Sequence, residues 1–176
     1  MPALALPGDG GAAPGEALWE ALAPLCGYAF AGRVVAGTEP SDAAIAAERL
    51  VMWVRDCGED EIRIPFHVGD DRSRTWVLTR TAAGVHLHHV HRHEDGSEDT
   101  VSRYGGHAAG AASGTTLDFP ADHRTAAMLP AAATNVWTVA VEPGHRFVYA
   151  LRREAEDRRF RVELDLTRPL PPPEGP

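Results

Sequence analysis

Residues 61–93 read Glu-Ile-Arg-Ile-Pro-Phe-His-Val-Gly-Asp-Asp-Arg-Ser-Arg-Thr-Trp-Val-Leu-Thr-Arg-Thr-Ala-Ala-Gly-Val-His-Leu-His-His-Val-His-Arg-His, and their pattern is the clearest indication of the fold. Three strand-like runs, 61–68, 74–80 and 85–93, are separated by two short segments that each contain glycine. Alternation of side chains with period two is typical of β-strands with one buried face, and short turns join such strands into antiparallel hairpins. The sequence therefore predicts a β-meander in the middle of the chain.

The same reading extends to the rest of the chain. Helical spacing of leucines predicts a short helix over 16–25, and a second short helix is expected over 42–48. Further strands are predicted over 27–36, 49–56, 98–104, 114–119, 134–141, 146–153 and 158–167, with a weaker signal over 123–128. We therefore expect an all-β protein, a single antiparallel up-and-down β-barrel of about ten strands with a short N-terminal helix. Residues 1–15 are predicted to be a flexible leader, 16–168 the barrel and 169–176 a proline-rich tail.

Composition excludes several classes of function. The chain has 176 residues and a formal net charge of −8, which disfavours nucleic acid as a partner because nucleic-acid binding needs clustered cations. All 17 basic residues are arginine, so Schiff-base chemistry and a P-loop lysine are excluded. No apolar run approaches the roughly 20 residues of a membrane span. We expect a small-molecule ligand and a chain that acts as a monomer or homodimer.

Hairpins of the simplest geometry set the register between the predicted strands. They pair the following residues on one inner face: Ile64 with Leu78, Phe66 with Trp76, Leu78 with Leu87, Trp76 with His89, Arg74 with His91, Leu87 with Tyr104, and His89 with Ser102. This face is apolar at one end and rich in histidine and arginine at the other, which predicts a barrel with a polar mouth. The opposite face, with His67, His86 and His88, is expected to meet solvent.

The polar mouth suits a partly apolar ligand with a polar or anionic head group. Arg74, His89 and His91 are expected to hold the head, because a guanidinium binds a carboxylate through two parallel hydrogen bonds. The other predicted ligand contacts are Phe66, Trp76, Leu78 and Leu87 for the apolar body, and Thr100 and Tyr104 for orientation. A hydrogen-bonded network with only a structural role is an alternative interpretation of the same side chains.

Two further alternatives use the same histidines. His89 and His91, with His93 or Glu98, are candidate ligands of a divalent metal such as Zn²⁺, since alternate residues of a strand place their side chains on one face. The charge of Arg74 opposite His91 disfavours a cation there. The second alternative is an enzyme, of isomerase or hydrolase type, that uses these histidines for acid–base or metal-assisted chemistry.

The segment Leu22-Ala-Pro-Leu-Cys-Gly-Tyr-Ala-Phe-Ala-Gly32 combines a short helix, a glycine, an aromatic residue and a second glycine at the start of a strand. Followed by hairpins, it resembles the calycin barrels, namely lipocalins, fatty-acid-binding proteins and nitrobindin-like proteins. The lipocalin Gly-x-Trp is absent, and no haem-ligand pattern is matched. The runs 61–80 and 91–99, with Tyr104-Gly-Gly, also resemble an uncharacterised bacterial family of often exported proteins, which implies no particular activity.

Cys26 and Cys57 stand at the open end of the first predicted hairpin. If the strands 27–36 and 49–56 are neighbours, the two thiols lie close enough for a disulfide, which implies an oxidising compartment. Two separate buried thiols are the alternative, and neither cysteine has a predicted histidine neighbour for catalysis. An exported or periplasmic location is favoured over the cytoplasm on this reasoning.

Overall fold

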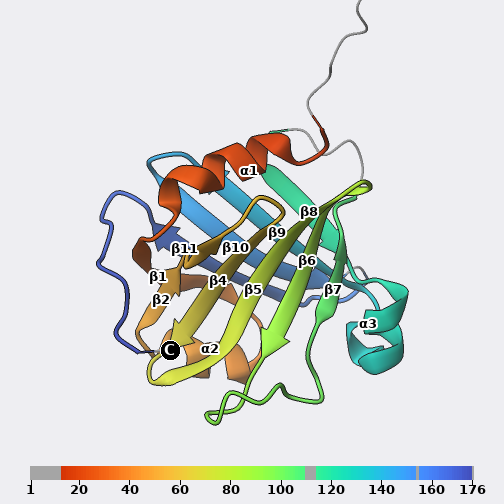
Figure 1. Cartoon of the computed structure of the whole chain (residues 1–176). Helices are drawn as coiled ribbons and strands as arrows, with labels where there is room; N and C mark the ends of the chain where they lie inside the picture. The colour runs from red at the N-terminus through yellow and green to blue at the C-terminus, as the bar shows by residue number, and fades with distance from the viewer. Residues whose placement is uncertain (1–12, 110–113, 154, 176) are drawn as a thin grey trace, which may run out of the picture.

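A computed structural model describes residues 13–109, 114–153 and 155–175, in which ten antiparallel strands form a nearly closed barrel (Figure 1). The predicted all-β barrel is confirmed. Around the barrel the strand order is β7-β6-β5-β4-β2-β1-β11-β10-β9-β8, so neighbours in the chain are neighbours in the sheet, and β11 pairs with β1. The strands are β1 (Ala29–Gly37), β2 (Leu50–Trp53), β4 (Glu61–Val68), β5 (Asp71–Thr81), β6 (Gly84–His91), β7 (Tyr104–His107), β8 (Thr116–Pro120), β9 (Asn135–Glu142), β10 (Arg146–Arg153) and β11 (Arg159–Asp165), and the short β3 (Asp56–Cys57) pairs with β4. The expected leader lies largely in residues 1–12, outside the described residues.

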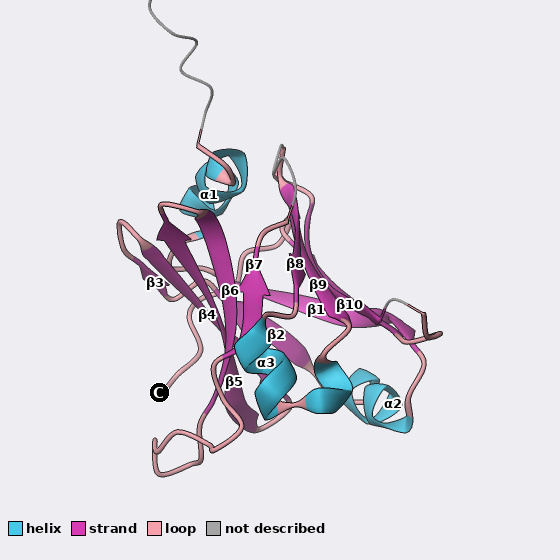
Figure 2. Ribbon diagram, turned by 90° about the vertical axis from the view of Figure 1, so that its right-hand side faces the viewer, coloured by secondary structure: helices cyan, strands magenta, loops and turns pink. Residues whose placement is uncertain are grey.

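Helices lie at both ends of the barrel (Figure 2). At one end, α1 (Glu16–Leu22) continues into the 3₁₀ turn η1 (Ala23–Leu25), as predicted. At the other end are α2 (Pro40–Ala46), α3 (His123–Met128) and the 3₁₀ turn η2 (Pro130–Ala132). No helix among the described residues is both long and apolar enough to cross a membrane.

Two of the predicted strands are wrong. The strand expected over 123–128 is α3, because the Asp122 side chain accepts a hydrogen bond from the Thr125 backbone N–H and so caps a helix. The strand expected over 98–104 begins only at Tyr104. Asp99 accepts from the Val101 N–H, and Arg103 has a φ of 63°, so the chain turns back before it joins the sheet.

The predicted strand pairing is wrong by two residues at two places, between β4 and β5 and between β6 and β7. Trp76 pairs with Ile64 instead of Phe66, because β5 begins at Asp71 and β4 is irregular between Phe66 and Val68. Tyr104 pairs with His89 instead of Leu87. Pairing of β5 with β6 is as predicted, including Trp76 with His89 and Arg74 with His91. A shift of two residues keeps each side chain on its face, so the same residues still point inward.

The barrel seam lies between β7 and β8, where few backbone groups pair directly. The Ala109 N–H donates to the Asp118 carbonyl, and the hydroxyl of Thr125 on α3 contacts both the N–H and the carbonyl of Gly105 at 2.8 and 2.9 Å. A Cβ at Gly106 would lie 1.8 Å from the Pro120 carbonyl oxygen, so only glycine permits this approach. The start of α3 therefore helps to close the barrel.

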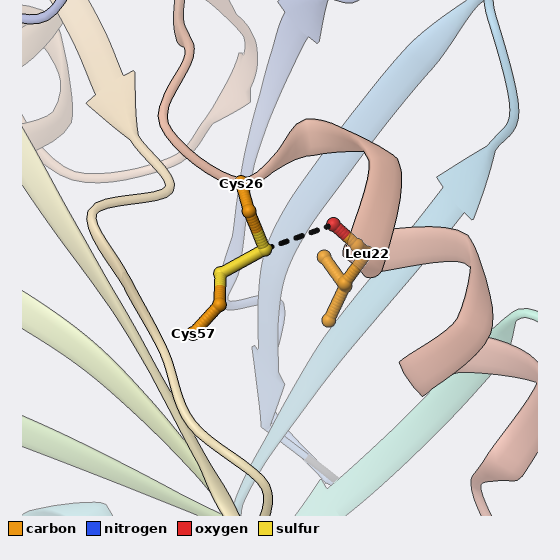
Figure 3. The surroundings of a disulfide bond; sticks show 3 residues. All are labelled: Leu22, Cys26 and Cys57. Atoms are coloured by element: carbon orange, nitrogen blue, oxygen red, sulfur yellow. Dashed lines mark hydrogen bonds between the residues drawn. A yellow bond between two sulfur atoms is a disulfide. The ribbon is translucent and has the colours of Figure 1, made fainter.

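A disulfide joins Cys26, which follows η1, to Cys57 on β3 (Figure 3). The two Cα atoms are 6.2 Å apart and 31 positions apart in the sequence. The Cys26 sulfur lies 3.9 Å from the Leu22 carbonyl oxygen at the end of α1. The bond therefore ties the end of the barrel that carries α1 to β3, the short strand paired with β4. The disulfide is the one that the sequence offered as an alternative to two separate thiols.

Candidate functional site

His89 of β6 is a buried polar residue inside the barrel, with an exposed fraction of 4%. Its Nδ1 lies 3.0 Å from the Tyr104 carbonyl oxygen, and its Nε2 lies 2.8 Å from the hydroxyl of Tyr149 on β10. A carbonyl can only accept, so Nδ1 carries the proton and Nε2 accepts from the Tyr149 hydroxyl. Both ring nitrogens of His89 are therefore satisfied by the protein.

Burial fixes the protonation states of this pair. Desolvation lowers the pKa of His89 to about 3, and the hydrogen bond to the Tyr104 carbonyl opposes this only in part. Burial also raises the pKa of Tyr149 well above its ordinary value. At neutral pH both groups are therefore uncharged.

Nearer the end of the barrel, His91 contacts Tyr104 and Arg74. His91 Nε2 lies 2.8 Å from the Tyr104 hydroxyl, and Arg74 is its partner across the β5–β6 ladder. The Arg74 Nη1 donates to Asp71 at 2.6 Å, and the Arg74 side chain is 31% exposed. We call Arg74, His91 and Tyr104 the polar end of the barrel.

Electrostatics at the polar end keep His91 neutral. Burial, and then the charge of Arg74, lower the pKa of His91. Burial raises the pKa of Tyr104 to about 12, although the Arg74 charge acts against this rise. The polar end therefore presents the Arg74 guanidinium, paired with Asp71, beside a neutral imidazole and a neutral phenol.

The four residues expected to hold an apolar ligand body fill the interior with one another and with the opposite wall. Phe66, Trp76, Leu78 and Leu87 have exposed fractions of 3% or less. The Trp76 ring stacks between Phe66 at 4.6 Å and Tyr149 at 4.4 Å. These side chains are core, and an apolar ligand group would have to contact the rim of the barrel instead.

Thr100 does not reach the predicted site. It is exposed in the turn after β6, and its hydroxyl contacts Asp99. The prediction assumed a strand over 98–104, and without that strand Thr100 has no inward position. Ser102 is buried, but its hydroxyl accepts from the His91 backbone N–H.

The predicted metal ligands are not brought together. Glu98 contacts Arg103 through both carboxylate oxygens, at 2.7 and 2.9 Å. His93 is exposed, and its Nε2 lies 4.0 Å from Asp99 instead of facing Glu98. Within residues 13–109, 114–153 and 155–175, no group of three or more His, Cys, Asp or Glu side chains has a metal-binding arrangement. His93 and Glu98 lie in the segment between β6 and β7, beyond the strand that carries His89 and His91.

Sequence reasoning missed the partners that reach His89 from the far wall of the barrel. The His89 ring lies 4.8 Å from Trp137 of β9, measured between ring centroids, and hydrogen-bonds Tyr149 of β10. Tyr149 pairs with Val162 in the hairpin of β10 and β11 and has an exposed fraction of 8%. What the alternation pattern lacks is any signal for which strand lies across the barrel.

The expected solvent-facing histidines are also wrong in part. His86 and His67 have exposed fractions of 6% and 7%. His86 is covered because α3 and its cap, Asp122, pack outside β6, with Asp122 Oδ2 at 3.4 Å from His86 Nε2. His67 lies near the end of β4, where the C-terminal segment returns and the Glu174 carbonyl accepts from Arg72 (Figure 1).

A surface hollow of about 620 Å³ lies elsewhere, against β1, β10 and β11. Its charged lining includes Arg146 and Glu163, which contact each other at 3.5 Å. Like Arg74 and Asp71 at the polar end, these two side chains form an ion pair, so charge pairing alone does not distinguish the hollow from the polar end.

No protein-family model, curated protein or solved structure was found that matches this chain.

Proposed function

We propose that this protein is a calycin-type binding barrel that takes a small molecule with an anionic group at Arg74, His91 and Tyr104. The observation that carries the proposal is Arg74, a partly exposed guanidinium at the end of a mainly apolar interior. A guanidinium has five N–H donors, and its contact with Asp71 uses one nitrogen, Nη1. The remaining donors suit a carboxylate or similar group.

An apolar part of the ligand would contact the rim. Leu151 lies two residues beyond Tyr149 on β10, and Arg74 lies two residues before Trp76 on β5. Because Trp76 stacks on Tyr149, Leu151 is on the wall opposite Arg74 at the same end of the barrel. Leu151 and Val34 are only partly buried against the core, so they offer apolar surface to a bound molecule.

The charge states favour binding over the competing hypothesis of an acid–base enzyme. A general base works best with a pKa near the working pH. Burial holds the pKa of His89 at about 3 and lowers that of His91.

The disulfide supports an oxidising compartment, so we place the proposed binding protein outside the cytoplasm.

The test compares dodecanoate with dodecanol, which share an alkyl chain and differ in the head group. Calorimetric titration should give tighter binding of dodecanoate to the unmodified protein. Arg74→Gln should weaken dodecanoate by about tenfold or more, the equivalent of one charged hydrogen bond, and leave dodecanol unchanged. Arg33→Gln, an exposed arginine on β1, is the matched control and should bind as the unmodified protein does. Equal binding of dodecanoate to both variants, or no binding of either probe, would refute the proposal.

A further inference from the structure

A cluster of histidines lies outside the barrel, between the sheet and the start of α3. His86 and His88 come from β6, and His107 comes from β7. The ring centroid of His86 lies 3.9 Å from that of His88 and 4.3 Å from that of His107. Asp122, the N-cap of α3, reaches the same cluster, with its Oδ2 3.4 Å from His86 Nε2. Three imidazoles therefore meet at the start of α3.

Hydrogen bonds join Asp122, His86 and His88 into a chain at neutral pH. Because a carboxylate can only accept, His86 Nε2 carries a proton and donates it to Asp122. His86 Nδ1 then has the lone pair and accepts from Nδ1 of His88, at a distance of 3.1 Å. Both imidazoles of this chain are neutral, and His88 keeps a lone pair on Nε2, where a first additional proton would bind.

Acid adds positive charge that this chain does not accommodate. A first added proton, on His88, lies near the charges of Arg103 and of Arg124 on α3. A second proton would have to bind Nδ1 of His86, so two N–H groups would face each other where one hydrogen bond now lies. Burial, followed by the charges of His86 and Arg103, lowers the pKa of His88 to about 4. Burial also lowers the pKa of His86, and His107 acts in the same direction.

The segments beside the two histidines of β6 do not offset an added charge. The residues paired with them on β5 are Thr79 and Val77, which are uncharged. Glu98, in the segment between β6 and β7, is bound by Arg103 through both carboxylate oxygens. Compensation of an added charge therefore falls to the N-cap carboxylate of α3.

This N-cap connects the histidine cluster to the barrel seam. The Asp122 backbone N–H donates to the Gly105 carbonyl of β7 at 2.9 Å, and Asp122 Oδ1 accepts from the Thr125 N–H at 2.8 Å. The Thr125 hydroxyl in turn contacts both the N–H and the carbonyl of Gly105, so that α3 lies against β7 (Figure 1). A displacement of Asp122 would therefore loosen the contacts that hold α3 on β7.

We propose that protonation of His86 and His88 in mildly acidic solution releases the start of α3 from β7 and opens the barrel at the seam between β7 and β8. Thr125 on α3 and Phe119 on β8, each with an exposed fraction of 0%, would then meet solvent. The opening gives small molecules a pH-controlled route to the barrel interior. It does not depend on the anion site at the polar end.

The sign and the size of the effect follow from His88. Its pKa is about 4 in the closed state and takes the ordinary value of 6.5 once the side chain is exposed. The closed state is therefore fully favoured above pH 6.5 and loses stability as the pH falls toward 4. Between pH 7 and pH 5, His88 raises the equilibrium constant for opening by about twentyfold, and His86 acts in the same direction.

The experiment is hydrogen–deuterium exchange of the full chain at pH 7 and pH 5, measured by mass spectrometry. Each rate is divided by the intrinsic exchange rate at that pH, which gives the equilibrium constant for opening. Peptides that cover α3 and β7 should show a constant at least about twentyfold larger at pH 5 than at pH 7. Peptides from β5 and β10 should stay protected over the same time.

Two substitutions at one position test the role of the imidazole. His88→Gln and His88→Asn should each lower the ratio of the constants at pH 5 and pH 7 by about twentyfold, because neither side chain takes up a proton. His145→Gln is the matched control, since His145 is exposed in the turn between β9 and β10, and it should leave the ratio unchanged.

Three results would overturn the proposal. The first is equal protection of α3 and β7 at the two pH values. The second is loss of protection in β5 and β10 together with α3, which would mean that the whole barrel unfolds. The third is an unchanged ratio in either His88 variant, which would show that the opening does not respond to this imidazole.

Discussion

Tyr149→Phe removes one hydroxyl from the centre of the barrel and leaves the rest of the side chain in place. The phenylalanine ring retains the stacking on Trp76, whose centroid is 4.4 Å away. His89 Nε2, which accepts from that hydroxyl at 2.8 Å, is left without a partner in a side chain that is 4% exposed. An unsatisfied buried acceptor costs about 1–3 kcal/mol, so the free energy of unfolding should fall by about that amount. Urea unfolding followed by tryptophan fluorescence measures this, and the midpoint should shift without a change in the m-value.

Tyr104→Phe is the matched comparison, because it removes the other phenol of the same interior. The Tyr104 hydroxyl contacts His91 Nε2 at 2.8 Å near the partly exposed end, where water can replace it. The loss should be below about 1 kcal/mol. The reasoning fails if Tyr149→Phe unfolds at the same urea concentration as the unmodified protein, or if Tyr104→Phe is the more damaging change.

Three further outcomes are expected. Burial lowers the pKa of folded His89 to about 3, so neutral His89 contributes fully to stability above its unfolded pKa of 6.5, and this contribution is lost as the pH falls toward 3. At pH 5 the free energy of unfolding should be roughly 2 kcal/mol lower than at pH 7. Urea unfolding curves at the two pH values measure this difference, and equal values would contradict the prediction. Asp42→Asn breaks the buried pair with Arg158, in which Asp42 is 3% exposed, and should cost about 3 kcal/mol in the same assay; an unchanged midpoint would mean that the pair is not formed in solution. Replacing Cys26 and Cys57 by serine opens a loop with a separation of 31 residues and should cost roughly 3–4 kcal/mol, and thiol labelling of the unfolded unmodified protein should find no free cysteine.

The meander of β4, β5 and β6 shows how far local patterns reach. Alternation placed Trp76, His89 and His91 on the inner face, and the short turn after Thr81 set the register of β5 against β6 as observed. The turn between β4 and β5 is tighter than the five-residue segment 69–73 suggests, so the register of β4 against β5 differs from the prediction by two residues. A register error of two residues leaves the predicted inner and outer faces correct, because side chains alternate with a period of two. The predicted pairs of residues on neighbouring strands are wrong.

The expected site was only partly assembled for a related reason. His89 and His91 are neighbours on one face of the same strand, and the sequence pattern predicts the same surroundings for both side chains. In the structure, His89 is sealed in the core by Tyr149, which is 60 residues away along the chain, and His91 lies at the partly exposed end with Tyr104 and Arg74. Thr100 and Glu98 lie outside the site because a turn replaces the expected strand 98–104. His93 lies outside it because β6 ends at His91.

The all-β class, the inner and outer faces of most strands and the excess of negative charge were predictable from the sequence, because each depends on residue type and short-range spacing. The sequence left the Cys26–Cys57 disulfide as one of two alternatives, and the structure contains it. Only the tertiary structure decided which walls meet across the barrel. The stacking of Trp76 on Tyr149 fills the space that alternation alone left open for a ligand. The packing of α3 over His86 turned an apparently solvated strand face into a buried cluster. Both depend on contacts between segments far apart in the chain, which no local periodicity encodes.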